Sequence, residues 1–163
     1  MKGDDKVIEY LNRGLRSELT AVHQYVLNAR LLEHWGLNTL ARKQEEEARE
    51  EMEHADRFIR RILFLGGNPN VQDMDTVRVG SNVKEILEAD LAAESEALAL
   101  YREAMGHCEK VRDYASRDLF GQLLSDEEGH YDFLETQLDL IERIGIQNYE
   151  QSAMGGAPAE GGE

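Results

Sequence analysis

The sequence predicts an all-α protein, built as a four-helix bundle with one long crossover connection and a short C-terminal fifth helix. Three observations support this prediction. The 163 residues are rich in Leu, Ala, Glu and Arg, which favour helices, and contain only two prolines, Pro69 and Pro158. Four long segments carry apolar residues at helical spacing. The connections between these segments are short, long and short, and a chain of this length is expected to form one domain.

The first helix is predicted to extend from about Asp5 to Trp35. The carboxylate of Asp4 or Asp5 can accept hydrogen bonds from the free amides at its start, and Gly36 can adopt the left-handed conformation that ends a helix. The residues expected on its buried face are Leu11, Leu15, Val22 and Ala29.

The second helix is predicted to begin at Asn38 or Thr39 and to stop at Leu65, before two glycines and Pro69. Because only a few residues separate it from the first helix, the two are expected to form an antiparallel hairpin. The residues expected on its buried face are Ala48, Ala55, Phe58 and Ile62.

The third and fourth helices are predicted to form a second hairpin. The sequence Asn-Val-Lys-Glu from Asn82 is typical of a capping box that begins a helix, which should end near Val111. Asp113 can cap the fourth helix and Gly145 can end it. The expected buried residues are Val83, Leu87, Leu91, Leu98, Tyr101, Met105, Phe120, Leu123, Leu134, Leu138 and Ile141.

The connection between the hairpins, residues 66–81, is long enough to run the length of the bundle. Sixteen extended residues reach ~50 Å, whereas a helix of about 27 residues is ~40 Å long. One long crossover of this kind is the connection pattern of ferritin-like bundles. Residues 146–154 can form a short fifth helix. We expect residues 1–154 to form the domain and residues 155–163, GGAPAEGGE, to be a disordered tail.

Charge and composition exclude several classes of protein. The net charge of −15 disfavours binding to nucleic acid, which needs a basic surface, although acidity can also serve solubility alone. Cys108 is the only cysteine, so neither an intrachain disulfide nor a cysteine-based metal cluster is possible. The N-terminus lacks an apolar signal-peptide core, and the longest uncharged stretch, residues 62–72, is too short to cross a bilayer. We therefore expect a cytoplasmic protein without membrane partners.

Two copies of the pattern Glu-x-x-His lie at Glu51–His54 and Glu127–His130. Residues three apart share one helix face, so each copy presents an oxygen ligand and a nitrogen ligand together. Two such pairs, with one glutamate from each of two other helices, form the dimetal site of carboxylate-bridged bundles. Because 22 of the 163 residues are glutamate, two such matches among five histidines arise by chance in roughly one sequence in seven.

The placement of Glu18 and Glu94 strengthens the prediction of a metal site. Both lie in the buried stripes of their helices, although glutamate is rarely buried without a partner. The predicted midpoints of the four helices lie within about three residues, or ~5 Å, of these glutamates and of the two Glu-x-x-His pairs. Four buried carboxylates repel one another, and two divalent cations would neutralise them. Oxygen-rich ligation with one imidazole per ion is typical of iron or manganese.

The predicted ligand roles follow from this arrangement. Glu51 and Glu127, each beside a histidine, are expected to bridge the ions, Glu18 and Glu94 to bind one ion each, and His54 and His130 to bind one ion each. The alternative is that the histidines and glutamates belong to solvated surfaces. Among neighbouring residues, Asp90 and Asp126 could orient a ligand histidine. Tyr25 could donate a hydrogen bond to a ligand or lose an electron during oxidation, and ordinary packing is its alternative.

At these residues the chain resembles a bacterioferritin. The resemblance covers nearly the whole chain and is carried by the segments LRSELTAVHQY (15–25), HWGL (34–37), REEMEHADRFIRRILFLGGNPN (49–70) and DEEGHYDFLETQLDLIERIGIQNY (126–149). The doubled Glu-x-x-His distinguishes it from animal-type ferritins, whose second metal position lacks the histidine.

The resemblance implies a function and a set of partners. Bacterioferritins form hollow shells of twenty-four subunits built from two-fold dimers, oxidise Fe(II) with oxygen or peroxide at a dinuclear iron centre, and store the Fe(III) mineral inside. A ferredoxin-type protein is the implied class of reductant for iron release. Haem b is held at each two-fold axis by one methionine per subunit, which here would be Met52. Without the resemblance, interface packing would be the favoured role for this methionine.

One departure from the family and two alternatives remain. Some members carry a histidine and an aspartate on the cavity-facing side of the second helix as an extra iron site, where this chain has Glu46 and Glu50. The first alternative is a haem-bearing or passive subunit of a mixed shell. The second is a rubrerythrin-like diiron peroxidase, although that class usually carries a cysteine-rich segment that one cysteine cannot supply.

Overall fold

The computed structural model describes residues 1–155 and contains five α-helices within that range, without a β-strand. Each helix boundary lies within about one residue of the predicted position, so the predicted all-α fold is confirmed. The helices are α1 (Asp5–His34), α2 (Asn38–Phe64), α3 (Val83–Lys110), α4 (Tyr114–Ile144) and α5 (Ile146–Met154). Apart from Gly155, the predicted C-terminal tail lies outside the described residues.

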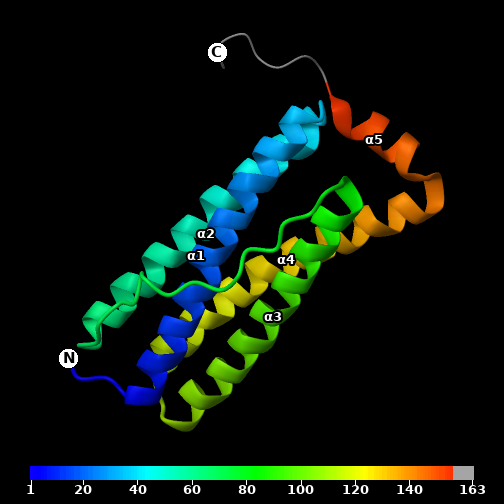
Figure 1. The fold of residues 1–163 in the computed structure, drawn as a ribbon. Helices are drawn as coiled ribbons and strands as arrows, with labels where there is room; N and C mark the ends of the chain where they lie inside the picture. The colour runs from blue at the N-terminus through cyan, green and yellow to red at the C-terminus, as the bar shows by residue number, and fades with distance from the viewer. Residues whose placement is uncertain (156–163) are drawn as a thin grey trace.

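Two antiparallel hairpins, α1–α2 and α3–α4, pack together as a four-helix bundle (Figure 1). The connection from α2 to α3 runs along the outside of the bundle, as its length predicted. It is bound to α1 by two backbone amides: that of Asp75 donates to Thr20 Oγ1 at 3.0 Å, and that of Arg78 donates to Gln24 Oε1 at 3.2 Å. This connection brings α3 back beside α1, and the two hairpins then meet around one central layer.

Side-chain caps fix the starts of three of the long helices. Asp4, Asn82 and Asp113 each accept a hydrogen bond from a backbone amide three residues later, at 2.9 to 3.0 Å. The capping box at Asn82 differs from its usual form, because the carboxylate of Glu85 accepts from the amide of Ser81, at 2.8 Å, one residue before the cap. Helix α2 follows Leu37 without a side-chain cap. Its position therefore depends on the tight turn at Gly36, whose φ of 83° suits glycine.

The apolar core of the bundle consists of two clusters separated along the helix axes. The first includes Leu15, Phe58 and Leu123, and the second includes Leu32, Leu87 and Leu134. The rings of Phe58, Tyr101 and Phe120 are packed within the first cluster, with centroids 5.4 to 5.8 Å apart. Between the clusters, buried polar and charged side chains take the place of apolar ones. The bundle therefore has a polar layer at mid-height.

Helix α5 leaves α4 at Gly145 and covers one end of the bundle (Figure 1). Tyr149 and Ala153 pack into the second cluster, and the hydroxyl of Tyr149 donates to Gln137 Oε1 at 2.9 Å. Some residues of the predicted buried faces are only partly covered in this chain, namely Val22, Leu91, Met105 and Leu138. Across the described part of the chain, the helices lack the combination of length and apolarity that crossing a membrane requires.

Candidate metal centre

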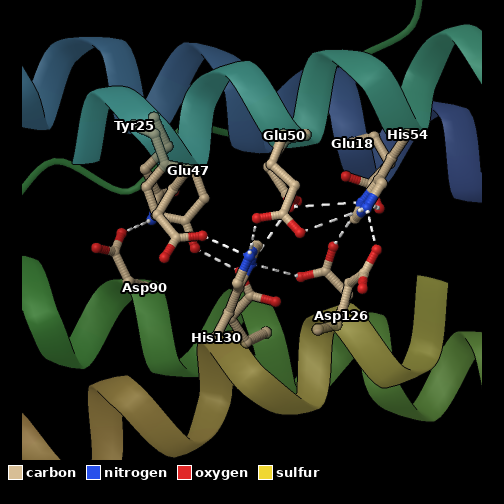
Figure 2. Close-up of polar contacts among 12 residues, drawn as sticks. Glu18, Tyr25, Glu47, Glu50, His54, Asp90, Asp126 and His130 are labelled. Atoms are coloured by element: carbon tan, nitrogen blue, oxygen red, sulfur yellow. Dashed lines mark hydrogen bonds and ion pairs between the residues drawn. The ribbon is translucent and has the colours of Figure 1, made fainter. Parts of the chain in front are cut away.

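The polar layer between the two apolar clusters contains all six predicted metal ligands. Helices α1 and α3 each contribute one glutamate, whereas α2 and α4 each contribute a glutamate and a histidine. None of the six is more than 6% exposed: Glu18, Glu51, His54, Glu94, Glu127 and His130. Figure 2 shows α2 and α4 facing each other across this layer, with His54 and His130 reaching into it.

The six residues form two overlapping sets. One ligand atom from each of Glu18, Glu51, His54 and Glu127 lies within 4.8 Å of the others, and Glu51, Glu94, Glu127 and His130 meet the same condition. Glu51 and Glu127 belong to both sets. We refer to them as the first and second ligand sets. Two sets that share two carboxylates can hold two ions bridged by those carboxylates, as the spacing of the Glu-x-x-His pairs predicted.

The two imidazoles are oriented alike. His54 Nδ1 lies 3.1 Å from Glu127 Oε1 and 3.4 Å from Glu18 Oε1, whereas its Nε2 points outward to Asp126 Oδ2 at 2.9 Å. His130 Nδ1 lies 3.2 to 3.6 Å from three carboxylates of the second ligand set. A carboxylate at Nε2 fixes the tautomer and leaves Nδ1 to face an ion. The predicted contact between Asp126 and a candidate ligand histidine is therefore confirmed.

Two further carboxylates contact the outer side of His130. Glu50 Oε2 lies 2.8 Å from Nε2, and Glu47 Oε2 lies 2.5 Å from the same atom. Glu50 also approaches His54 Nε2, at 4.0 Å, and Figure 2 shows its side chain between the two imidazoles. Glu47 was not predicted to lie in the site, because α2 carries many glutamates and only its burial distinguishes it. Glu46, by contrast, is exposed.

Burial and mutual repulsion set the protonation of the carboxylates. Burial raises the pKa values of Glu51 and Glu94 well above the ordinary value for glutamate, and it also raises the pKa of Glu18. Burial acts on Glu127 in the same direction, but hydrogen bonding to Glu94 and the imidazoles outweighs it, and its pKa falls well below the ordinary value. Burial disfavours a charged His54, yet Glu127 and Glu18 raise its pKa to about 11. Without cations, the cluster therefore retains protons.

Several buried atoms of the site have no hydrogen-bond partner among the described residues. These atoms are Glu18 Oε2, Glu51 Oε1, Glu127 Oε2 and His130 Nδ1. Buried polar atoms left unpaired are costly, so their convergence in one layer indicates a missing partner. Three oxygens and one imidazole nitrogen are suitable ligands for a divalent cation such as Fe(II). The residues present therefore fit a dinuclear metal site.

Two buried tyrosines donate hydrogen bonds to the glutamates of the site. The hydroxyl of Tyr25 on α1 donates to Glu94 on α3, and the hydroxyl of Tyr101 on α3 donates to Glu18 on α1. The Tyr25 contact is one of its two predicted roles. Tyr101 was expected only as a core residue. The sequence does contain a signal for it, because Glu18, Tyr25, Glu51 and His54 recur 76 residues later as Glu94, Tyr101, Glu127 and His130.

Asp90 does not contact a histidine, contrary to the prediction. Its carboxylate is fully buried and accepts hydrogen bonds from the amides of Gln24, Asn28 and Gln44, at 2.7 to 2.9 Å. Burial raises its pKa to about 7. The residue lies one turn from Glu94 on α3. Its two carboxylate oxygens are occupied by hydrogen bonds from the glutamine and asparagine side chains of α1 and α2. Asp90 therefore links α1, α2 and α3 by hydrogen bonds beside the polar layer and does not orient a candidate ligand histidine.

Comparison with known proteins agrees with this geometry. A family model described as a ferritin-like domain matches residues 8–144. A bacterioferritin from Rhodobacter capsulatus is 53% identical and one from Brucella melitensis is 54% identical, each over the full length of both chains. The chain belongs to the bacterioferritin family. A bacterial ferritin from Synechocystis is 46% identical over 94% of this chain and 99% of its own.

Membership of the bacterioferritin family supports a role in iron storage, and the buried carboxylate and imidazole groups fit a metal site. Met52, the methionine assigned to haem by resemblance, lies on α2 directly after Glu51 and is 51% exposed. Its side chain therefore lies outside the polar layer and is accessible on the surface of this chain. The haem role of Met52 stays a prediction.

Proposed function

We propose that this bacterioferritin is a ferroxidase that oxidises Fe(II) to Fe(III) with oxygen or peroxide and stores the ferric mineral in a twenty-four-subunit shell. The observation that carries this proposal is the pair of ligand sets sharing Glu51 and Glu127. Two Fe(II) ions would supply the two electrons that reduce one hydrogen peroxide, which takes up two protons and becomes two water molecules. A passive metal store would not need two imidazoles aimed at one shared pair of carboxylates.

Each residue of the centre has a proposed role. Glu51 and Glu127 would bridge the two ions, Glu18 and Glu94 would bind one ion each, and His54 and His130 would each bind through Nδ1. Asp126 and Glu50 hold the imidazoles by their outer nitrogens, which favours the tautomer with a free Nδ1. Tyr25 donates a hydrogen bond to Glu94, and in this proposal it would lose an electron during oxidation, with Glu94 accepting the phenolic proton. The surrounding apolar clusters limit access of bulk water.

Anaerobic titration with Fe(II), followed by stopped-flow mixing with oxygen or peroxide, tests the proposal. We expect saturation at two Fe(II) per subunit and a fast first oxidation phase that ends when those ions are consumed. A chain that takes up iron without a fast phase would instead be a passive or haem-bearing subunit of a mixed shell. A centre that turns over peroxide without depositing mineral would correspond to the rubrerythrin-like alternative.

Without metal, the chain is expected to become less stable as the pH rises from 5 to 8. The pKa values of Glu18, Glu51 and Glu94 are raised above the unfolded value of 4.5, and that of His54 is raised above 6.5, to about 11. The folded state therefore holds more protons than the unfolded state. This stabilisation is complete below the unfolded pKa values and is lost as the pH rises through the folded ones, at about 1.4 kcal/mol per pH unit for each additional proton. Glu127 contributes to the pH dependence of stability only below about pH 4.5, because its pKa is lowered.

Metal should reverse this pH dependence, because ions and protons compete for the same carboxylates. We therefore expect the increase in Tm produced by Co(II), relative to chelator-treated protein, to grow steadily from pH 5 to pH 8. Thermal unfolding of both forms at four pH values measures this difference. An increase in Tm that is independent of pH would contradict the buried carboxylate cluster.

The other proposed partners follow from the family. We propose a homo-oligomeric shell of two-fold dimers, with haem b held by Met52 of each subunit and a ferredoxin-type reductant for iron release. Glu46 and Glu50 could provide an inner-surface iron site, and Glu50 already contacts His130. The cytoplasm is the proposed location, where a lone buried thiol such as Cys108 stays reduced.

A further inference from the structure

Tyr101 occupies a position in the metal centre equivalent to that of Tyr25. It is fully buried, and its hydroxyl donates a hydrogen bond to Glu18 Oε1. Tyr25 makes the same contact with Glu94. Both the tyrosines and the glutamates are separated by 76 residues in the chain. In each pair, the tyrosine lies on one hairpin and the glutamate on the other, so the two hydrogen bonds cross the interface between hairpins in opposite directions.

The packing around Tyr101 fixes the position of its hydroxyl. Its ring lies 5.8 Å from the ring of Phe58 and 5.7 Å from that of Phe120, all within the first apolar cluster. Close-packed aromatic rings have few alternative rotamers, so the hydroxyl has little freedom to move. The phenol is therefore a rigid donor presented to the metal layer.

The hydrogen bond leaves one oxygen of Glu18 available. Oε1 accepts from Tyr101, whereas Oε2 is buried and has no hydrogen-bond partner within residues 1–155. A carboxylate held at one oxygen presents the other in a defined direction. Since Glu18 belongs only to the first ligand set, this constraint acts on that set and not on the second.

We propose that Tyr101 is a positioning residue that fixes Glu18 as a ligand of the first ion, as Tyr25 fixes Glu94 for the second. The inference rests on the proposed ferroxidase centre and states which tyrosine positions a ligand of which ion. Each ion then depends on a tyrosine from the opposite hairpin. Loss of a residue that orients a metal ligand typically lowers metal affinity by about 10- to 100-fold.

Anaerobic titration with Co(II) tests this assignment in variants that isolate each ligand set. His130→Ala disables the second set, and His54→Ala disables the first. In the His130→Ala background, Tyr101→Phe should weaken the remaining Co(II) site by about 10- to 100-fold, whereas Tyr25→Phe should leave it unchanged. In the His54→Ala background, the two phenylalanine variants should exchange these effects. Equal weakening in both backgrounds, or no weakening in either, would overturn the proposal.

A double-mutant cycle separates positioning from a general effect on the core. If Tyr101 acts through Glu18, then Tyr101→Phe should have no further effect on Co(II) affinity once Glu18→Gln is present. Tyr10→Phe is the matched control, because Tyr10 is also buried and donates to a glutamate, Glu103, at 3.0 Å, away from the ligand sets. A full loss of affinity in the Tyr10 control, or additive effects in the cycle, would assign Tyr101 a structural role only.

Failure of the proposed function gives a different pattern. If the wild-type protein binds two Co(II), and the variants show the dependence on Tyr101 and Tyr25 given above, the positioning role is supported. If the same protein does not oxidise Fe(II), the proposed ferroxidase activity is refuted. Wild-type protein that binds no Co(II) refutes both.

Discussion

Replacing His130 with alanine is expected to slow the initial oxidation of Fe(II) by at least about 100-fold. His130 is the nitrogen ligand of the second set, and its Nδ1 lies within 3.6 Å of Glu51, Glu94 and Glu127. Loss of a residue that merely orients a ligand already costs about 10- to 100-fold, so loss of the ligand itself should cost more. Stopped-flow absorbance of the ferric product, at two Fe(II) per subunit, measures the rate.

The control for this variant is His34→Ala, because His34 lies at the exposed end of α1. Glu18→Ala should reproduce the loss from the first ligand set. Both variants of the ligand sets should assemble as the wild type does, because the apolar clusters on either side of the polar layer are unchanged. Initial rates equal to those of the wild type would show that the centre lies elsewhere.

Met52→Leu is expected to remove bound haem completely while leaving Fe(II) oxidation unchanged. Leucine is similar in size to methionine but has no thioether sulfur, so a haem iron loses its axial ligand. Met52 is 51% exposed, and the side chain that precedes it, Glu51, is buried in the metal layer. The proposed haem ligand is therefore exposed whereas the neighbouring candidate metal ligand is buried, and we expect the substitution to affect haem binding alone.

Haem content per subunit, measured by visible absorption after reconstitution, tests the role of Met52. Met154→Leu provides a matched control, because Met154 is 50% exposed and lies on α5, away from the metal layer. If haem content survives in Met52→Leu, the axial ligand is a different residue. If Fe(II) oxidation fails together with haem binding, the substitution has disturbed Glu51.

The sequence predicted the fold almost completely because the local signals were consistent. Caps at Asp4, Asn82 and Asp113 and the glycine at position 36 each mark a boundary by chemistry that acts within a few residues. The convergence of the six candidate ligands in one layer was also predictable, because a glutamate in an apolar stripe is unusual on any one helix and four at one height are more so.

The contacts that were missed depend on which helix faces which. Asp90 was expected beside a histidine, but three amides from α1 and α2 surround it. Glu47 contacts His130 across the bundle, and nothing in the sequence distinguishes it from its acidic neighbours. Tyr101 has the spacing of a core residue, and its offset of 76 residues from Tyr25 was the one sequence signal for its hydrogen bond to Glu18. Periodicity gives the buried face of each helix but not its partner across the interface.

Because Glu51 and Glu127 belong to both ligand sets, two ions bound there would also link the helices to one another. Each ligand set takes three residues from one hairpin and one from the other, so each ion ties residues of α2 to residues of α4. Such a link would close a loop of the chain, as a disulfide does, but it would stabilise the protein by binding to the folded state. With a single cysteine, this chain cannot form an internal disulfide. The long-range link between its hairpins would instead be reversible, since it would be present while ions are bound and absent when they leave.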